Sequence, residues 1–316
     1  MTAPAIQTAS LWRARLRLRL RTIRGFVSRF TRRPDGVLGL AILAVFVVLA
    51  IVPDLFVGPL ETATTGSGGV LDPPSAAHLL GTDEIGRDIL NLTVHGTRIS
   101  MVIGLLATVV TVLLGSVVGI VAGFVGGWLD SLLMRITDFF LVLPTFVLAL
   151  ILAPLILELV GTDAELFGIR LTLLVIVIVI GVTSWASTAR IIRSQTLSMK
   201  ERAFVDRARV IGSGSGHIML HHILPNVLNL IVANTVLIFG GSILTETTLS
   251  FIGLGDPFQP SWGQILNAAQ SAGAPGLGAW WYMGPPAVSI VLVVLAFTLV
   301  GSALDDVLNP KLRVRR

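Results

Sequence analysis

The feature that most constrains this chain is a series of six long apolar segments. They cover approximately residues 37–57, 99–125, 136–157, 171–188, 227–249 and 287–304. Each is close to the roughly 20 residues that a helix needs to cross the hydrocarbon core of a bilayer. Backbone polar groups in lipid must be bonded within the protein, which favours helices. The sequence therefore predicts an all-α membrane protein with six transmembrane helices.

Composition agrees with this prediction. Of the 316 residues, 53% are hydrophobic and 13% are charged, whereas charged residues make up about a quarter of a typical soluble domain. Cysteine is absent, which excludes disulfides and thiolate chemistry. The first apolar segment begins at Val37 and is long enough to span a bilayer, so we do not expect a cleaved signal peptide.

The distribution of basic residues predicts the orientation. If the N-terminus is cytoplasmic, the inward segments hold 20 of the 23 Lys and Arg residues. Cytoplasmic loops of membrane proteins carry such an excess. We therefore expect both termini in the cytoplasm and residues 189–226 as a large inward loop. Because the positive charge follows the membrane topology, it does not predict nucleic-acid binding.

The same topology divides the chain into parts. They are a basic cytoplasmic tail (1–36), the first helix and outer loop (37–98), a five-helix core (99–304) and a cytoplasmic C-terminal tail (305–316). The tail is rich in arginine and is expected to lie on anionic lipid. Four aromatic residues of the last outer segment are expected at the level of the outer headgroups. They are Trp262, Trp280, Trp281 and Tyr282.

The inward loop contains the polar stretch "ERAFVDRARVIGSGSGHIMLHHILPN", residues 201–226. Its first part is predicted to be a helix with one apolar face, formed by Ala203, Phe204, Ala208 and Ile211. The glycines of "GSGSG" permit a sharp turn. A second short helix from His217 is expected to end or bend near Pro225, because proline cannot continue the helical hydrogen bonds. The product is a helix–turn–helix suited to dock on another protein.

This stretch resembles the cytoplasmic loop of ABC importer permease subunits in the peptide and nickel branch. That loop has Glu-Ala-Ala, three residues, Gly, nine residues, Ile, one residue and Leu-Pro. Here Gly212, Leu224 and Pro225 match in register. The positions that depart from the pattern are Asp206, Arg207 and His222.

Three further stretches are similar to the same branch. They are "HLLGTDEIGRDILNLTVHGTRIS" (78–100), "ETTLSFIGLGDPFQPSWGQIL" (246–266) and "LDDVLNPKLR" (304–313). The resemblance extends from about residue 37 to residue 313. It implies a permease fold in the bacterial inner membrane, with a coupling loop that fits a groove on an ATPase subunit. The residues that would carry coupling are Ala203, Phe204, Asp206, Arg207, Ala208, Gly212, Leu224 and Pro225.

The resemblance also implies partners and a substrate. The partners are a homologous permease subunit, two ABC ATPase subunits and an extracytoplasmic substrate-binding protein. The substrate would be a di- or oligopeptide, with nickel or another small solute as the alternative. ATP and magnesium would bind to the ATPase subunits, and no cofactor is expected in this chain.

The motif "GTDEIGRD" lies before the second apolar segment. Thr82 or Asp83 is expected to cap a short helix on the outer membrane surface, with Ile85, Ile89 and Leu92 on one face. This helix either takes part in receiving the binding protein or closing the outer mouth, or is only interfacial. The candidate residues are Gly81, Thr82, Asp83, Gly86, Arg87 and Asp88.

Ionisable residues inside a membrane span are candidates for function. Asp138 and Glu246 lie near the ends of predicted spans, where we expect them to pair with other groups or cap helices. His217, His221 and His222 lack neighbouring carboxylates or thiolates spaced for a closed metal site, so no metal is expected.

Absent motifs limit the remaining classes. The chain has two lysines, Lys200 and Lys311, and neither is in a Gly-Lys-Ser/Thr loop, so ATP hydrolysis by this chain is not expected. It also lacks the usual nucleophile and metal-hydrolase motifs of enzymes. A secondary transporter driven by an ion gradient is the main rival, but its typical broken helices and internal repeats are not evident.

Overall fold

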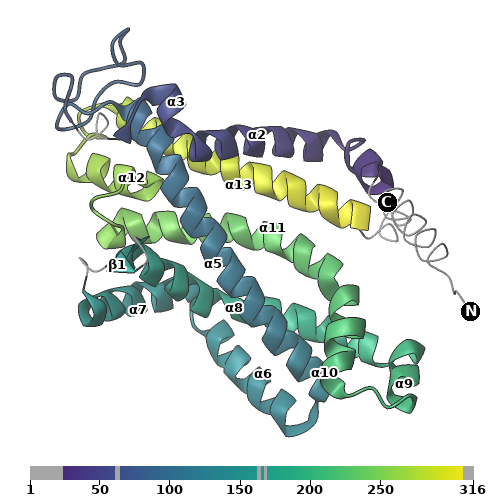
Figure 1. The fold of residues 1–316 in the computed structure, drawn as a ribbon. Helices are drawn as coiled ribbons and strands as arrows, with labels where there is room; N and C mark the ends of the chain where they lie inside the picture. Colours follow the sequence, from purple (N-terminus) through teal and green to yellow (C-terminus); the bar gives the residue numbers. More distant parts are fainter. Residues whose placement is uncertain (1–23, 61–64, 162–164, 167–168, 309–316) are drawn as a thin grey trace, which may run out of the picture.

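A computed structural model of the chain describes residues 24–60, 65–161, 165–166 and 169–308. Most of the predicted basic tail, and the C-terminal residues from 309 onward with Lys311, lie outside this range. The regular secondary structure of these residues is almost entirely helical (Figure 1), as the all-α prediction requires. The exception is a short antiparallel ladder in which β1 (Glu165–Leu166) pairs with β2 (Ile169–Arg170).

Five helical segments in this range are long and apolar enough to cross a membrane, or six if one bent pair counts as a span. Four are α2 (Pro34–Ile51), α5 (Ile89–Val125), α8 (Leu171–Lys200) and α13 (Trp280–Leu308). The fifth runs through α10 (Ser215–Ile218), η1 (Met219–Ile223), α11 (Leu224–Leu249) and η2 (Ser250–Leu254). Besides the bent pair, the shorter helices include α3 (Pro53–Val57), α9 (Ala203–Val210) and α12 (Trp262–Ser271).

The prediction of a continuous third span over 136–157 is wrong. The chain there forms α6 (Gly127–Val142) and α7 (Thr145–Val160), which meet at an angle of 92°. Pro144 follows the break and has no N–H to continue the helix. Leu143 before it is extended, with φ −77° and ψ 131°, as steric contact with a following proline favours.

The helix that contains the second span begins ten residues before the predicted segment. Helix α5 has 37 residues, or about 55 Å at 1.5 Å per residue, which exceeds a hydrocarbon core of about 30 Å. Its N-cap is Asp88, whose side chain accepts a hydrogen bond from the Asn91 N–H at 3.1 Å. The first turns of α5 therefore extend past the hydrocarbon region.

Helices α5 and α8 cross at close range along a row of glycines. Gly115, Gly119 and Gly123 recur every four residues on α5 and are buried. A Cβ atom at Gly119 would lie 2.6 Å from the carbonyl oxygen of Ala189 and 2.9 Å from the Ile192 Cβ on α8. Small residues at this spacing let two membrane helices approach until their backbones touch.

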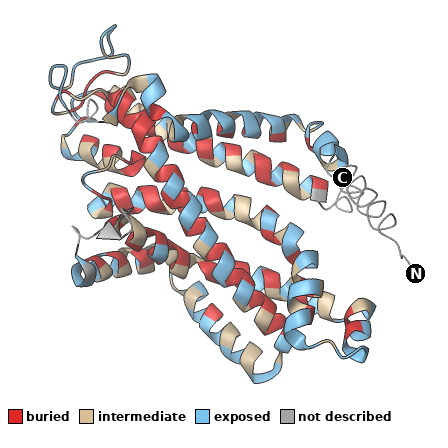
Figure 2. Cartoon of the chain, viewed as in Figure 1, coloured by how far each residue is buried: buried red, intermediate tan, exposed pale blue. Residues whose placement is uncertain are grey.

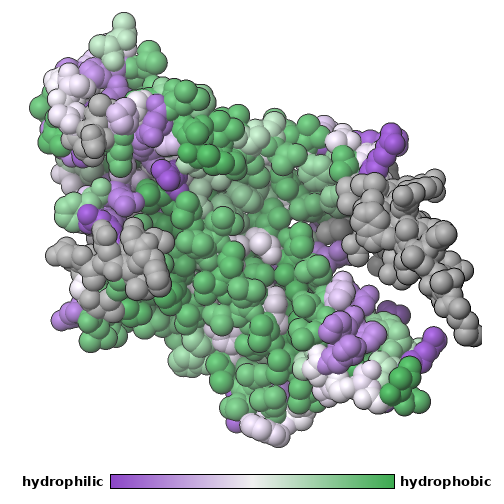
Figure 3. Space-filling model, viewed as in Figure 1, coloured by the Kyte–Doolittle hydropathy of each residue, from purple (hydrophilic) through white to green (hydrophobic). Residues whose placement is uncertain are grey.

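The rest of the bundle packs around this pair. Helix α13 lies along α2, and its Phe297 stacks on Phe239 of α11 with ring centroids 3.9 Å apart. Figure 2 shows buried residues concentrated inside the bundle, whereas the outward side of α2 is exposed. Figure 3 shows apolar surface across the middle of the molecule and hydrophilic residues at two opposite ends. This distribution fits a protein that crosses a bilayer.

The prediction of an outer aromatic belt is only half right. Trp280 is exposed, but Trp262 and Tyr282 are fully buried inside the protein. The Trp262 indole donates to the Thr93 carbonyl at 3.1 Å, and its ring stands edge-on to Phe46 at 5.8 Å. Long-range packing, and not the bilayer interface, positions these two residues.

Candidate functional site

The predicted coupling stretch forms a compact element at the end of the molecule where α8 ends and α11 begins (Figure 1). Helix α9 ends at a turn in which Gly212 has φ +88°. The Ser213 N–H donates to the Ala208 carbonyl at 3.0 Å, and the Gly212 N–H donates to the Arg209 carbonyl at 2.9 Å. This pair of bonds is a Schellman motif, which requires a left-handed residue at the position of Gly212.

The turn at Gly212 agrees with the prediction that the glycines of this stretch permit a sharp reversal. No atom lies within 4 Å of a Cβ built at Gly212, so steric room does not select glycine there. Only the positive φ selects glycine at this position. Of the other two glycines in "GSGSG", Gly214 has an ordinary φ of −68°.

The inward face of α9 packs against the membrane helices of the same chain. Val205 is fully buried and Ala208 nearly so, in a cluster with Phe124 of α5, Ile192 of α8 and Val227 of α11. Phe204 packs at the edge of this cluster. A displacement of α9 would therefore press on three spans at once.

The outward apolar surface of the element differs from the predicted face. Ala208 faces inward, whereas Val210 and Ile211 are 88% and 83% exposed at the end of α9. Leu220 on the following helix is also exposed. Val210 was not singled out from the sequence, because helical spacing alone does not show which face the rest of the bundle covers.

The second helix of the element bends but does not end at Pro225. It starts at Ser215 and passes through the π-helical turn η1 into α11, where Pro225 lies in the first turn. The Leu224 N–H reaches back five residues to the Met219 carbonyl. Figure 1 shows the chain turning between α10 and α11 at this point. A wider turn just before a proline removes the clash that a proline causes in a regular helix.

The predicted polar residues of the element are all solvent-facing. Asp206 and Arg207 are exposed, and Asp206 accepts from Arg209 at 3.3 Å within α9. The guanidinium of Arg209 also lies 5.8 Å from the Phe124 ring centroid, which ties α9 to the end of α5. Ala203 and Pro225 are exposed and Leu224 is half-buried.

Asp138 belongs to a pair of ionic contacts between α6 and α8. It accepts from Arg190 at 2.6 Å, and both side chains are more than half exposed. Two turns earlier on α6, Asp130 accepts two hydrogen bonds from Arg193 at 2.6 and 2.7 Å. These contacts hold α6 beside the part of α8 that leads into α9.

The motif "GTDEIGRD" forms a loop and not the predicted interfacial helix. Residues 81–88 are turns and a single bridge between Thr82 and Asp88. Thr82 and Asp83 cap no helix here, because their side chains bind the loop itself. The Thr82 hydroxyl donates to the Gly69 carbonyl at 2.6 Å, and Asp83 accepts from the backbone N–H groups of Ile85 and Arg87.

The predicted apolar face of that helix is also split. Ile85 is 56% exposed on the loop, whereas Ile89 and Leu92 are buried in α5. Gly81 and Gly86 lie at turns of the loop. The helix that Asp88 caps is α5. The motif therefore forms the last part of the loop that leads into this membrane helix.

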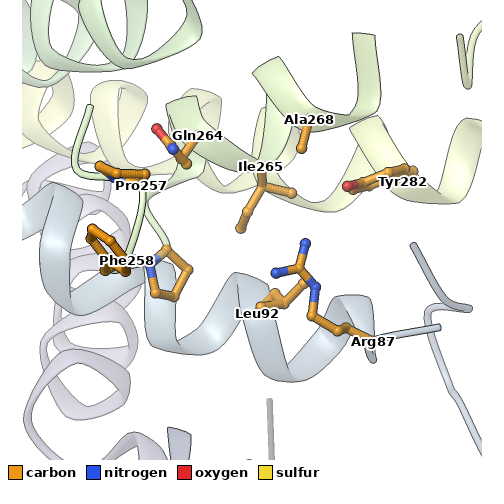
Figure 4. A pocket seen from close by; sticks show the side chains of 9 residues that line it. Arg87, Leu92, Pro257, Phe258, Gln264, Ile265, Ala268 and Tyr282 are labelled. Carbon is orange, nitrogen blue, oxygen red and sulfur yellow. The ribbon is translucent and has the colours of Figure 1, made fainter. Parts of the chain in front are cut away.

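A charged cluster fixes this loop to the start of α13. Arg87 pairs with Asp83 and Glu84, and the Tyr282 hydroxyl donates to Glu84. Burial favours a lower pKa for Arg87, but the hydrogen bond and charge of Asp83 outweigh it and raise that pKa above its ordinary value. Figure 4 shows Arg87 and Tyr282 at one end of a cavity of about 80 Å³. Its small volume makes it a packing gap and not a substrate site.

Glu246 is fully buried near the C-terminal end of α11. It accepts from Ser250 at 2.9 Å and from Thr247 at 3.5 Å, and Ser100 and Ser261 also hydrogen-bond to it. The two hydroxyls of Ser100 and Ser261 in turn accept from backbone N–H groups of α12. The carboxylate therefore joins α11, α5 and α12.

A larger cavity of about 660 Å³ opens at the same end of the molecule. It lies between α5, the start of α8, the segment around α3 and the loop before α12. Its polar lining includes Asp54, His95, Arg98, Arg170 and Gln259. Sequence analysis did not identify this site, because its residues come from four separate segments.

These observations define the class of the protein: a multi-pass helical membrane protein, with a small element packed on the ends of three spans and a polar cavity at the opposite end. Comparison with known proteins gives the family. The chain belongs to the binding-protein-dependent transport system inner membrane component family, whose model matches residues 115–314. It is a multi-pass protein of the bacterial plasma membrane, and members of this family are membrane components of transport systems, without a catalytic role of their own.

Several curated relatives match nearly the full length. The dipeptide transport system permease protein DppC of Alkalihalophilus pseudofirmus is 34% identical over 88% of this chain and 86% of its own. The DppC protein of Bacillus subtilis is 34% identical over 90% and 84% of the two chains. The oligopeptide transport system permease protein OppC of Bacillus subtilis is 33% identical over 90% and 88%.

Proposed function

We propose that this chain is a permease subunit of an ATP-driven importer of di- or oligopeptides, which forms the translocation pathway with a homologous permease. The observation that carries the proposal is the similarity, over 88–90% of the chain, to dipeptide and oligopeptide permease proteins. The wider partner set consists of two ATPase subunits, which bind ATP and magnesium, and an extracytoplasmic substrate-binding protein. Nickel or another small solute is the alternative substrate.

The geometry of residues 201–226 supports a coupling role. Val210 and Ile211 offer an exposed apolar contact for an ATPase groove, whereas Val205 and Ala208 bind the other side of α9 to α5, α8 and α11. The short helix can therefore transmit movement of the ATPase to the spans. Such transmission requires contacts that differ in free energy between the two states of the transporter.

The proposed orientation places residues 201–226 in the cytoplasm and the loop before α5 outside. Because the chain has no cysteine, single cysteines can report it directly. We expect a cysteine at Ser213 to react only with reagents that enter the cytoplasm. One at the exposed Ser67 should react in sealed cells with an impermeant maleimide. Labelling of the Ser213 site from outside would contradict this orientation.

The proposed function is tested by import into proteoliposomes that contain the complete transporter. We expect import of short peptides to require ATP at the ATPase subunits and the loaded binding protein. A proton or sodium gradient alone should drive none. Import driven by a gradient without ATP would instead support a secondary transporter, and import of nickel but not peptides would support the alternative substrate.

A further inference from the structure

The cavity of about 660 Å³ contains an arginine that the chain itself does not neutralise. Arg98 lies on α5 and lines the cavity, yet within the described residues no carboxylate forms an ion pair with it. Its neighbours on the same helical face are His95, Ile99 and Val102. Arg98 is exposed in the first turns of α5, so its guanidinium is open to a ligand that enters the cavity.

The second guanidinium of the cavity is already engaged, whereas its carboxylate, Asp54, is mostly exposed, and the nearby His95 Nε2 lies 3.0 Å from the Gly58 carbonyl oxygen. Arg170 lies 3.6 Å from Asp256 and over the ring of Phe258 at 4.2 Å. Asp54 lies 3.8 Å from the His95 ring. The lining thus has two guanidinium groups and one carboxylate, and Arg98 is the cation that remains available.

The size and lining of the cavity fit a small ligand with one anionic end. Ligand sites are typically about 300–1,000 Å³, with mostly apolar walls and a few placed polar groups. Here the walls include Ile103, Leu106, Leu173 and Val177. A guanidinium binds a carboxylate through two parallel hydrogen bonds. Every unmodified peptide carries such a group at its C-terminus, whatever its side chains.

From this arrangement we propose that Arg98 binds the C-terminal carboxylate of the peptide as it enters the membrane part of the transporter. Arg170, the residue just before α8, adds positive charge to the same lining. This proposal rests on the proposed function, since it requires a peptide substrate and the cavity end of the molecule facing outward. It makes Arg98 a specificity-determining residue that accepts free peptides independently of their sequence.

The test uses the complete transporter in proteoliposomes, with alanine peptides of two to five residues as free acids and as C-terminal amides. For each peptide, the import rate of a variant is divided by the wild-type rate, so any preference of the binding protein cancels. We expect Arg98→Gln to lower import of the acids about tenfold, the effect of losing one charged hydrogen-bonded pair, and import of the amides by less than about twofold. Arg98→Lys should restore part of the rate for the acids.

Arg135→Gln is the matched control, because it removes one exposed positive charge from α6, away from the cavity. For Arg135→Gln, the import rate relative to wild type should be near one for both the acids and the amides. Equal losses for acids and amides, or no loss for either, would overturn the role of Arg98 while leaving peptide import intact. Loss of the partner permease from purified Arg98→Gln complexes would also overturn it, since Arg98 would then pair with a carboxylate of that subunit. A wild-type transporter that imports none of these peptides would contradict the proposed function itself.

Discussion

Replacing Gly212 by valine is expected to abolish transport while the chain stays in the membrane. Gly212 has φ +88°, a region that β-branched residues reach only with strain of about 1–3 kcal/mol. The strain would open the turn that closes α9 and shift the exposed Val210 and Ile211. We expect normal amounts of membrane protein, little import, and either weaker retention of the ATPase subunits or ATP hydrolysis that no longer responds to the loaded binding protein.

The chain offers a close control for this variant. Gly214 lies two residues later and is equally open to solvent, but its φ of −68° suits any residue. Gly214→Val adds the same side chain without strain and should keep most of the import activity. If Gly212→Val also imported normally with ATPase subunits fully bound, the coupling role of residues 201–226 would be wrong and the element would be only a solvated loop.

Replacing Gly119 by leucine is expected to prevent stable folding of the bundle. The side chain would enter the crossing of α5 and α8, where even a Cβ atom comes within 2.6 Å of the Ala189 backbone oxygen. The helices would have to separate, which would also disturb the contacts at Gly115 and Gly123. We expect a loss of about 3 kcal/mol or more in the free energy of unfolding. The measurements are the amount of chain in the membrane and its melting temperature in detergent.

Gly241→Leu provides the comparison for this second variant. Gly241 is also in a membrane helix, but it is exposed and has no atom within 4 Å of a built Cβ. The added leucine should therefore leave the melting temperature nearly unchanged. Equal melting temperatures for Gly119→Leu and wild type would show that the two helices do not cross as closely as the structure indicates.

Much of the fold follows from the sequence because it depends on local chemistry. A run of apolar residues in lipid must satisfy its backbone hydrogen bonds internally, so the long segments become helices. The split of basic residues predicts which side of the membrane each loop faces. The register of Gly212 with Leu224 and Pro225 located the helix–turn–helix, although which side of α9 faces outward did not follow from it.

Some differences between the predicted and the observed structure also have causes in the local sequence. Pro144 lies within the predicted third span and breaks its helix. A prediction from apolar content alone does not show this break. The glycines of α5 recur every four residues, which is a local signal for close helix contact. At the outer motif, Thr82, Asp83 and Asp88 are all capable caps, and local preference cannot choose among them.

By itself, the sequence determined the membrane class, the helical composition and the family resemblance, since these depend on hydrophobic length, charge distribution and residue spacing. The tertiary structure alone decided which side chains meet. It buried Trp262 and Tyr282, placed Glu246 among serines from other segments, and left Arg98 beside Arg170 in one cavity. Those contacts join residues far apart in the chain, so their free energies depend on how the helices cross and not on any local pattern.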